Sequence, residues 1–477
     1  MSNLVYGVKD KPGLWKTILF AFQQVLAILA ATIVVPVIIN GNTADLFADN
    51  KMGFVSNMSQ SAALLGAGVG TIVYLLFTRF KSPVFLGSSF AFLGSMTAAF
   101  AGAASASAGY LGLIIGAVMA GLVYVIIALV VKYAGVNWIS KIMPAAVIGP
   151  TVAIIGLSLS GNAIGDIMKG GILVEKLVDG VPTMVSLCSP YIALLCGLVT
   201  LAVIVICSVY GKKMMKIIPF IIGICAGYAL AALFTVIGNA ANIDALKVIN
   251  FSLFENMQWL PDFTFVGAIN GFGEVTNWGS FIATLAVAYI PVAFVVFAEH
   301  LADHKNISSI IGEDLLKEPG LHRTLLGDGV GSMVGAFFGG CPNTTYGESV
   351  GCVAISGNAS VVTIFTAAVI CIVASFVAPF VTLLATIPAC VMGGVCIALY
   401  GFIAVSGLKM IQKVDLNKNH NLFTVSVILI AGVGGMTLSF GDITITSIAC
   451  ALILGILVNL LGSKAAKKEE AEASDNK

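Results

Sequence analysis

The feature that most constrains this chain is a series of apolar runs of about 18 to 25 residues, the length that a helix needs to cross the hydrocarbon core of a bilayer. The clearest runs are Ile18–Ile39, Leu111–Val131, Ile192–Val209, Thr363–Leu384 and Ile443–Leu461. Only 10% of the residues are charged, whereas a soluble globular chain has about 25%. An outer-membrane barrel would instead show alternating segments of about ten residues. We therefore predict an all-α polytopic membrane protein.

Fourteen segments are predicted to span the membrane, and the basic residues around them set their orientation. If the N-terminus is cytoplasmic, all Lys and Arg except Lys51, Lys169, Lys176 and Lys247 fall on the cytoplasmic side. This bias predicts a multi-pass protein of the plasma (inner) membrane with both termini in the cytoplasm. The predicted spans are 17–39, 57–78, 82–100, 109–131, 138–160, 190–209, 217–237, 279–303, 325–340, 342–356, 360–384, 387–408, 420–438 and 441–462.

The remaining composition excludes several classes of function. The net charge is +1, so neither a nucleic acid nor an acidic partner is indicated. The ten cysteines are scattered through apolar stretches without CxxC spacing, which favours small buried side chains over metal or redox chemistry. The first apolar run is too long for a signal peptide.

The two halves of the chain contain similar segments. Pro144–Gly149 (PAAVIG) is echoed by Pro388–Gly393 (PACVMG), and each opens a predicted span. These are the fifth and twelfth spans, so the halves have an odd number of crossings and opposite orientations. An inverted repeat of this kind is typical of secondary transporters.

A second pair of segments is interrupted by Pro and Gly. Ser82–Phe92 and Gly340–Ser349 lie in the third and tenth spans, and Ser-Ser-Phe of the first corresponds to Thr-Thr-Tyr of the second. Pro lacks an N–H and Gly weakens helix interiors, so neither segment can form a continuous helix. Broken backbone at membrane depth must be satisfied by protein or by a water-filled cavity. Paired breaks in corresponding halves therefore predict a solute site, although re-entrant packing without a ligand is an alternative.

One carboxylate lies within the second broken segment. Glu348 stands in a stretch from Arg323 to Lys409 whose only other charged residue is Asp328. An ionised carboxylate at the bilayer centre costs about 2.5–3.5 kcal/mol on insertion scales, and burial favours its neutral form. Such a group can carry a proton or accept a hydrogen bond from a substrate N–H, so Glu348 is a candidate functional residue.

A second polar cluster, Glu299, His300, Asp303 and His304, ends the eighth predicted span. Glu299 and Asp303 are four residues apart on one helical face, and the two histidines share a neighbouring face. Histidine titrates near neutrality, so the cluster could pass protons. Because residues 279–298 already form a full span, a position at the cytoplasmic interface is equally open. A metal site from His300, Asp303 and His304 is a weak alternative, since no further His lies nearby.

Four motifs resemble the uracil permeases of the nucleobase–ascorbate transporter family. They are AEH at Ala298–His300, PGLHR at Pro319–Arg323, PNTTYGE at Pro342–Glu348 and LGSSFAF at Leu86–Phe92. The likeness extends over nearly the whole chain. Glu348 resembles the pyrimidine branch, because purine and xanthine members usually carry Gln at that position.

The resemblance implies a 7+7 inverted-repeat fold with short strands in segments 3 and 10. It divides the chain into a core domain and a gate domain, each built from both halves. Residues 17–134 and 279–385 would form the core domain, and residues 135–238 and 386–462 the gate domain. Residues 1–16 would be a cytoplasmic N-terminus, 239–278 an extracellular connection, and 463–477 a disordered cytoplasmic tail.

The resemblance also implies a site, a ligand and a mechanism. Carboxylates matching Glu299 and Glu348 would bind the nucleobase, and Glu299, Asp303 and His304 would couple transport to protons. The expected ligand-binding residues are Glu299, Glu348, Phe90, Gly347, Tyr346, Tyr400 and Ala31. The expected function is proton-coupled uracil import by an elevator-like movement, without a cofactor, in contact with lipid and with dimerisation through the gate domain. Close relatives can carry His where this chain has Asp303 and Gln24, so a relay that uses those histidines is in doubt.

Three other functions compete with this interpretation. The first is a xanthine or purine permease of the same family, and the second is an anion transporter of the same fold. An anion site would need cations or amides, whereas this chain offers two carboxylates. The third is a membrane enzyme or channel, for which the sequence supplies no nucleophile–base pair or metal site, and a continuous pore would not need paired breaks.

Overall fold

The structure is a computed structural model that describes residues 4–475 except 50, 136–137, 139–141, 179–180, 213 and 441–442. Within these residues, eight helical stretches are long and apolar enough to cross a membrane. They are α1 (Leu14–Ala48), α2 (Gln60–Phe77), α4 (Ala106–Ala134), α6 (Ala145–Ser158) with α7 (Ser160–Asp166), α8 (Pro190–Tyr210), α10 (Pro219–Ala240), α13 (Trp278–Ile311) and α18 (Ala389–Ile411).

Shorter helices and three strand pairs complete the described chain. The helices are α3 (Leu93–Ala101), α9 (Met214–Ile217), α11 (Thr264–Ile269), α12 (Gly271–Glu274), α14 (Leu321–Gly339), α15 (Gly347–Ser356), α16 (Val361–Ser375), α17 (Ala378–Ala385), α19 (Asn419–Val433) and α20 (Ser447–Asp475). Single helical turns are η1 (Phe90–Phe92), η2 (Asp244–Leu246), η3 (Phe251–Asn256) and η4 (Leu316–Gly320). The strand pairs are β1 (Leu86–Ser88) with β4 (Asn343–Thr345), β2 (Leu173–Val178) with β3 (Val181–Ser186), and β5 (Leu438–Phe440) with β6 (Ile443–Ile445).

Local sequence explains where several of these helices begin and end. The side chains of Ser59, Ser105 and Asn277 accept hydrogen bonds from backbone N–H groups in the first turns of α2, α4 and α13, which are N-terminal caps. Pro190 and Pro219 open α8 and α10, where the missing N–H of proline does no harm.

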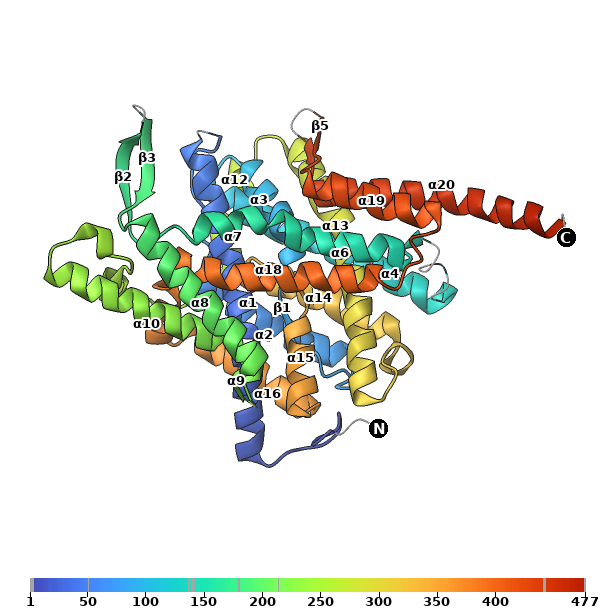
Figure 1. Ribbon diagram of the computed structural model, residues 1–477, viewed down its shortest axis with the longest axis horizontal. Helices are drawn as coiled ribbons and strands as arrows, with labels where there is room; N and C mark the ends of the chain where they lie inside the picture. The colour runs from blue at the N-terminus through green and yellow to red at the C-terminus, as the bar shows by residue number, and fades with distance from the viewer. Residues whose placement is uncertain are drawn as a thin grey trace.

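The helices pack in two groups, each of which combines elements from both halves of the chain. In the first group, α2 packs on α14 and α16, α4 packs on α13 and α14, and α1 packs on α16. In the second group, α18 packs on α6 and α8, α10 packs on α8, and α19 packs on α6 and α20. Figure 1 shows α6 and α18 side by side, with the β2–β3 hairpin and the N-terminal end of α1 at opposite ends of the view.

The two broken segments meet in the middle of the first group. Strand β1 pairs with β4 in antiparallel register, with Leu86 opposite Thr345 and Ser88 opposite Asn343. Both strands are fully buried. Each strand leads into a short helix: β1 into η1 and α3, and β4 into α15. The segments predicted as breaks therefore lie side by side although they are more than 250 residues apart in the sequence.

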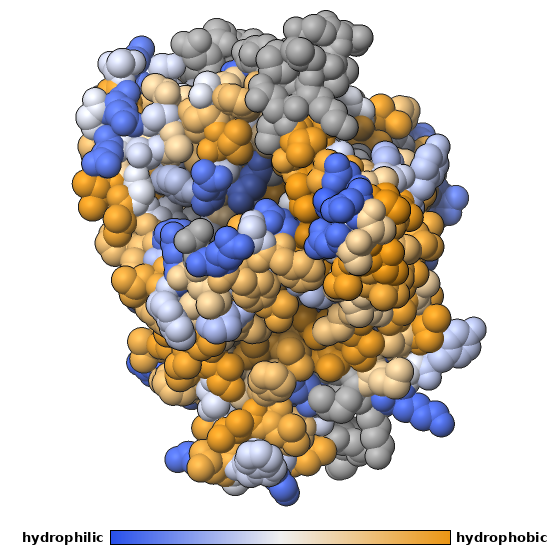
Figure 2. All heavy atoms as spheres, turned by 90° about the vertical axis from the view of Figure 1, so that its left-hand side faces the viewer, coloured by the Kyte–Doolittle hydropathy of each residue, from blue (hydrophilic) through white to orange (hydrophobic). Residues whose placement is uncertain are grey.

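The outer surface suits a lipid environment. Ile206 on α8 is 51% exposed and Val236 on α10 is 60% exposed, and side chains of this kind are stable outward only where the surroundings are apolar or an interface covers them. The face in Figure 2 shows a broad hydrophobic area, with hydrophilic residues concentrated in its upper part and along its lower edge. The chain is a multi-pass membrane protein.

The structure differs from the predicted spans at three places. The eighth span was expected to end at 303, but α13 continues to Ile311, because residues that the apolar window excluded are buried by partners from other helices. The expected span 360–384 is two helices, α16 and α17, with a bend of 84° between them, where Pro379 begins a new helix. The expected span 441–462 contains strand β6 before α20 begins at Ser447. Part of the expected span 138–160, at 139–141, lies outside the described residues.

The C-terminal tail also differs from the expectation. Residues 463–477 were expected to be disordered, but α20 continues to Asp475. The tail is rich in Ala, Lys and Glu, which are strong helix formers, so the helix can extend beyond the apolar segment.

Close contact between α2 and α14 depends on glycines. A Cβ atom on Gly66 would lie 2.5 Å from the carbonyl oxygen of Gly335 and 3.1 Å from the Cα of Gly339. Small residues of this kind allow membrane helices to approach closely. The strand pair is attached to this contact. The side-chain nitrogen of Asn343 in β4 donates a hydrogen bond to the Gly66 carbonyl oxygen on α2 at 2.9 Å.

We predict that Gly66→Ala destabilises the protein although alanine favours helices. The added methyl group would push α2 from α14, and such overpacking costs about 1–3 kcal/mol. Gly41→Ala in α1 is the matched control, because nothing lies within 4 Å of its Cβ position. Thermal unfolding in detergent should show a lower melting temperature for Gly66→Ala and an unchanged or slightly higher one for Gly41→Ala. Equal melting temperatures would contradict the packing argument.

Candidate functional site

A cavity of about 440 Å³ lies between the two groups of helices. Its wall from the first group comes from α1, η1, α13, β4 and α15, and its wall from the second group comes from α6, α8, α10 and α18. The cavity reaches the end of the molecule where α8, α13, α15 and α18 end, since Ser208, Asn306, Ile355 and Met410 line it there. Lys216, which is exposed, also lines it.

Both predicted carboxylates face this cavity. Glu299 lies on α13, and Glu348 is the second residue of α15. The first turn of a helix has backbone N–H groups without intrahelical partners, so Glu348 stands beside hydrogen-bond donors as well as being an acceptor itself. The site therefore offers acceptors and donors in close proximity, which suits a ligand that has both N–H groups and carbonyl oxygens.

Asp303 lies one turn after Glu299 and also lines the cavity. Its carboxyl group accepts a hydrogen bond of 2.7 Å from the hydroxyl of Thr345, at the end of β4. Asp303 is only 8% exposed, so this bond fixes α13 to the broken segment at the level of the site. Glu299 and Asp303 therefore line a cavity that reaches one end of the molecule.

The two histidines of the same cluster point away from the cavity. The Nδ1 of His304 is 2.8 Å from the His300 carbonyl oxygen, and its Nε2 is 2.7 Å from the hydroxyl of Tyr74 on α2. The Nδ1 of His300 is 2.7 Å from a carboxyl oxygen of Asp328 on α14. Both rings are fully buried. His304 was expected to couple protons, but it does not line the cavity and joins α13 to α2 instead.

The proposed metal ligands do not converge. Asp303 faces Thr345, whereas His300 and His304 contact α14 and α2. Among the described residues, no group of three or more His, Cys, Asp or Glu side chains could hold a metal ion. The weak metal-site alternative therefore has no support in the described geometry.

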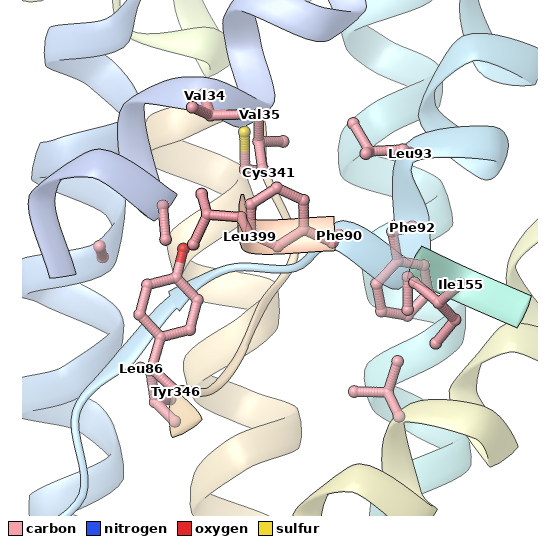
Figure 3. Packing of buried hydrophobic residues seen from close by; sticks show 14 of the residues in the cluster. Val34, Val35, Leu86, Phe90, Phe92, Leu93, Ile155, Cys341, Tyr346 and Leu399 are labelled. Carbon is pink, nitrogen blue, oxygen red and sulfur yellow. The ribbon is translucent and has the colours of Figure 1, made fainter. Parts of the chain in front are cut away.

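The aromatic residues divide into two sets. Phe90 and Tyr346 line the cavity from the two broken segments, and the Tyr346 hydroxyl donates to the Ser88 carbonyl oxygen at 2.8 Å. Figure 3 shows these two side chains on either side of the β1 strand, with Leu399 of α18 beside Phe90. Tyr400 does not line the cavity, but its ring lies edge-on to Phe90 with 6.0 Å between the centroids.

Of the two small residues expected to bind the ligand, Gly347 lines the cavity and Ala31 does not. Gly347 is exposed and lines the cavity. Ala31 is 1% exposed and is not part of the cavity wall, whereas Ala27, one turn earlier on α1, is. The helix α1 therefore reaches the cavity through Ala27, and the role of Ala31 stays a prediction.

Sequence reasoning missed several residues that line the cavity. Asn306 continues the face of α13 that carries Glu299 and Asp303, and the spacing of three or four residues could have revealed it. Thr344 and Thr345 belong to a predicted broken segment but were not assigned a role. Lys216 was counted only as a cytoplasmic boundary residue. Phe402 and Ile403 come from α18, and no local signal marks them.

The opposite end of the molecule is closed by polar contacts between the two groups. The side chain of Asn162 on α7 donates to Asn42 on α1 at 3.0 Å, and Asn42 donates to Thr97 on α3 at 3.1 Å. Lys169 lies 3.6 Å from Asp45 at the end of α1. These contacts lie at the end of the molecule opposite the one that the described lining of the cavity reaches.

Sequence comparison gives the relatives of this chain. A sequence model described as "Permease family" matches residues 15–440. The chain is 36% identical to a uracil permease of Bacillus caldolyticus, covering 97% of this chain and 95% of that one. It is 34% identical to a uracil permease of Bacillus subtilis, covering 98% and 97%, and 33% identical to one of Escherichia coli, covering 97% and 94%.

Solved structures show the fold. The transmembrane domain of the cyanobacterial bicarbonate transporter BicA aligns with a TM-score of 0.58 at 16% identity, covering 95% of this chain and 98% of that one. SLC26A9 aligns with a TM-score of 0.61 at 13% identity, covering 93% and 65%. The predicted all-α polytopic membrane fold is confirmed; the count of fourteen spans and the inverted repeat stay predictions.

We predict that Thr345→Val destabilises the protein more than Thr345→Ser. Valine keeps the shape but leaves the buried carboxyl of Asp303 without its donor, and an unsatisfied buried polar group costs about 1–3 kcal/mol. Serine keeps the hydroxyl. Thermal unfolding in detergent at neutral pH should show a lower melting temperature for the valine variant. If the valine and serine variants melt together, the Thr345–Asp303 bond does not hold the site.

Proposed function

This chain belongs to the permease family that contains the uracil permeases, and from that premise we propose that it imports uracil by proton symport. It is a transporter and not an enzyme. The observation that carries the uracil assignment is the pair of carboxylates, Glu299 and Glu348, facing one cavity that also contains the N-terminus of α15. The orientation that accompanies the proposal has both termini in the cytoplasm of the cell and the cavity open to the cytoplasm.

Uracil matches the chemistry of this cavity. It is planar, with two N–H donors and two carbonyl acceptors. Carboxylates accept but do not donate when ionised, so Glu299 and Glu348 suit the N–H groups. The free backbone N–H groups at Phe90 and Gly347, where the half-helices begin, suit the carbonyl oxygens. The rings of Phe90 and Tyr346 supply flat apolar surface beside the base.

The proposed mechanism is a displacement of one helix group against the other. The core domain would comprise residues 17–134 and 279–385, and the gate domain residues 135–238 and 386–462. The cavity lies between elements of the two, so movement of the core domain would carry the ligand past the gate domain. The proposed proton carriers are Glu299 and Asp303, because both are acidic and line the cavity, whereas His304 has only the indirect role of holding α13. The gate domain has an exposed face through which two copies of the chain would form a homodimer. Membrane lipid would surround the protein.

A xanthine or purine permease is the main competing function within the family. An uptake assay with a panel of unlabelled bases and labelled uracil, at two external pH values, separates the two. We expect unlabelled uracil to compete strongly, xanthine to compete weakly, and uptake to rise as the external pH falls, because a lower external pH increases the inward proton gradient. Strong inhibition by xanthine with none by excess uracil would overturn the proposal.

An anion carrier is disfavoured by the cavity itself. Glu299, Asp303 and Glu348 all face it, and Lys216 is the basic residue among the described residues that line it. Three carboxyl groups around an anion would repel it. The likeness to bicarbonate and anion transporters therefore concerns the fold and not the site.

We predict that Glu348→Gln weakens uracil binding roughly 10- to 100-fold, because a hydrogen bond to a charged group contributes about 1.5–3 kcal/mol. The amide keeps the size of the side chain but replaces one acceptor with a donor. Binding is measured by calorimetry or by ligand-dependent thermal stabilisation in detergent. Unchanged affinity, with an unchanged melting temperature of the ligand-free protein, would remove Glu348 from the contact.

We predict that Glu299→Gln abolishes uracil accumulation driven by a pH gradient. The amide cannot exchange a proton, so the loaded and unloaded states lose their difference in charge. Uptake is measured in proteoliposomes with an imposed gradient, and an unchanged melting temperature of the ligand-free variant in detergent is the control for folding. If the variant still concentrates uracil, another residue carries the proton, and Asp303→Asn is the next variant to test.

A further inference from the structure

The connection between α10 and α13 presents large apolar side chains to its surroundings. Five of them form the apolar rim: Trp259, Leu260, Val266, Ile269 and Phe272, which are 53% to 69% exposed. Single exposed apolar residues are normal on any protein, but a group within fourteen residues is not. The sequence predicted an extracellular connection here, and a connection surrounded by water would expose polar side chains instead.

The apolar rim continues the surface of the membrane-spanning helices. Phe265, beside the rim, stacks on Phe337 of α14 with 4.8 Å between the ring centroids and an angle of 6°. Phe337 is itself 41% exposed. Both α11 and α12 pack against α4, which is long and apolar enough to span the membrane. The rim therefore begins where the lipid-facing surface of the helix bundle ends.

The composition around the rim is that of a membrane interface. No Lys or Arg occurs between Lys247 and Lys305, although Asp and Glu do. On α11, Thr264 and Ala268 are buried while Val266 and Ile269 face outward, so the exposed side of this short helix is apolar. Aromatic residues, Trp above all, gather at the boundary between lipid and water.

A hollow of about 740 Å³ lies under the rim. Trp259, Leu260 and Phe263 line one side, and Met58 and Tyr110 line the other, at the ends of the elements that face away from the substrate cavity. The lining is mostly apolar, so water gains few hydrogen bonds there, whereas a hydrocarbon chain would be removed from water.

We propose that this connection is an interfacial membrane anchor, whose apolar rim contacts the phospholipids of the leaflet at the end of the molecule opposite the substrate cavity. Acyl chains cover the rim and reach the hollow beneath Trp259. The connection packs on α4 and α14. The lipid would therefore contact the first group of helices, which also contains β1 and β4. This inference does not depend on which solute is carried.

The test uses the full chain in proteoliposomes, with Trp259 as the reporter. The chain has four tryptophans, and the variant Trp15→Phe, Trp138→Phe, Trp278→Phe retains only Trp259. Its fluorescence is compared in phosphatidylcholine with and without bromine on the acyl chains, which quenches only on contact. We expect emission about twofold lower in the brominated lipid, and little further quenching by iodide in the water phase.

A second reporter keeps the proposal testable if the variant that retains only Trp259 does not fold. Phe272→Trp, in a chain whose four native tryptophans are Phe, places the fluorophore at another position of the rim and should be quenched by brominated lipid in the same way. The same chain without Phe272→Trp gives the background. Quenching by iodide but not by brominated lipid would show that the rim faces water. Quenching by neither would show that protein covers it, such as a second copy of the chain. Either result would overturn the proposal.

Discussion

Pairing of backbone hydrogen-bonding groups in the buried centre of the molecule is the constraint on which this fold depends. A helix satisfies its own N–H and C=O groups, but Pro83 and Pro342 and the glycines beside them prevent a continuous helix at two places that must cross the bilayer. Strands β1 and β4 solve the problem by pairing with each other. Their pairing also places the first turns of η1 and α15 at the same depth, with free N–H groups, and this creates the donor side of the cavity.

Side chains from the surrounding helices hold this strand crossing in place. Thr71 of α2 bonds both the N–H and the carbonyl oxygen of Leu86, and Asn343 reaches the Gly66 carbonyl oxygen on the same helix. The Ser349 hydroxyl accepts a hydrogen bond from the backbone N–H of Phe85 at 3.2 Å and another from the side chain of Gln24. Gln24 can form a hydrogen bond but cannot carry a proton, and in this structure it bonds the first turn of α15, next to Glu348.

The parts of the site that the sequence predicted are those with a local signal. Pro, Gly and a lone Glu348 in an apolar stretch mark a break and a functional residue by composition alone. The depth of Glu299 had no such signal, because the polar residues that follow it are buried by Tyr74, Asp328 and Thr345, all distant in sequence. The same limit explains why the sequence did not reveal the contact of His304 with Tyr74. The β2–β3 and β5–β6 hairpins were missed because short alternating segments are not distinct within an apolar sequence.

The contacts within the first group and the contacts between the groups at the closed end differ in strength, and this difference has a consequence for movement. Within the first group, α2 and α14 are in glycine-mediated backbone contact, which cannot loosen without losing dispersion and hydrogen bonding. At the closed end, the contact between groups includes a part-buried Asn42–Asn162 hydrogen bond and an exposed Lys169–Asp45 pair. Exposed ion pairs contribute about 0–1 kcal/mol, and water can replace both contacts. Opening these two contacts therefore costs less than separating α2 from α14, which agrees with the displacement of one helix group against the other that we propose.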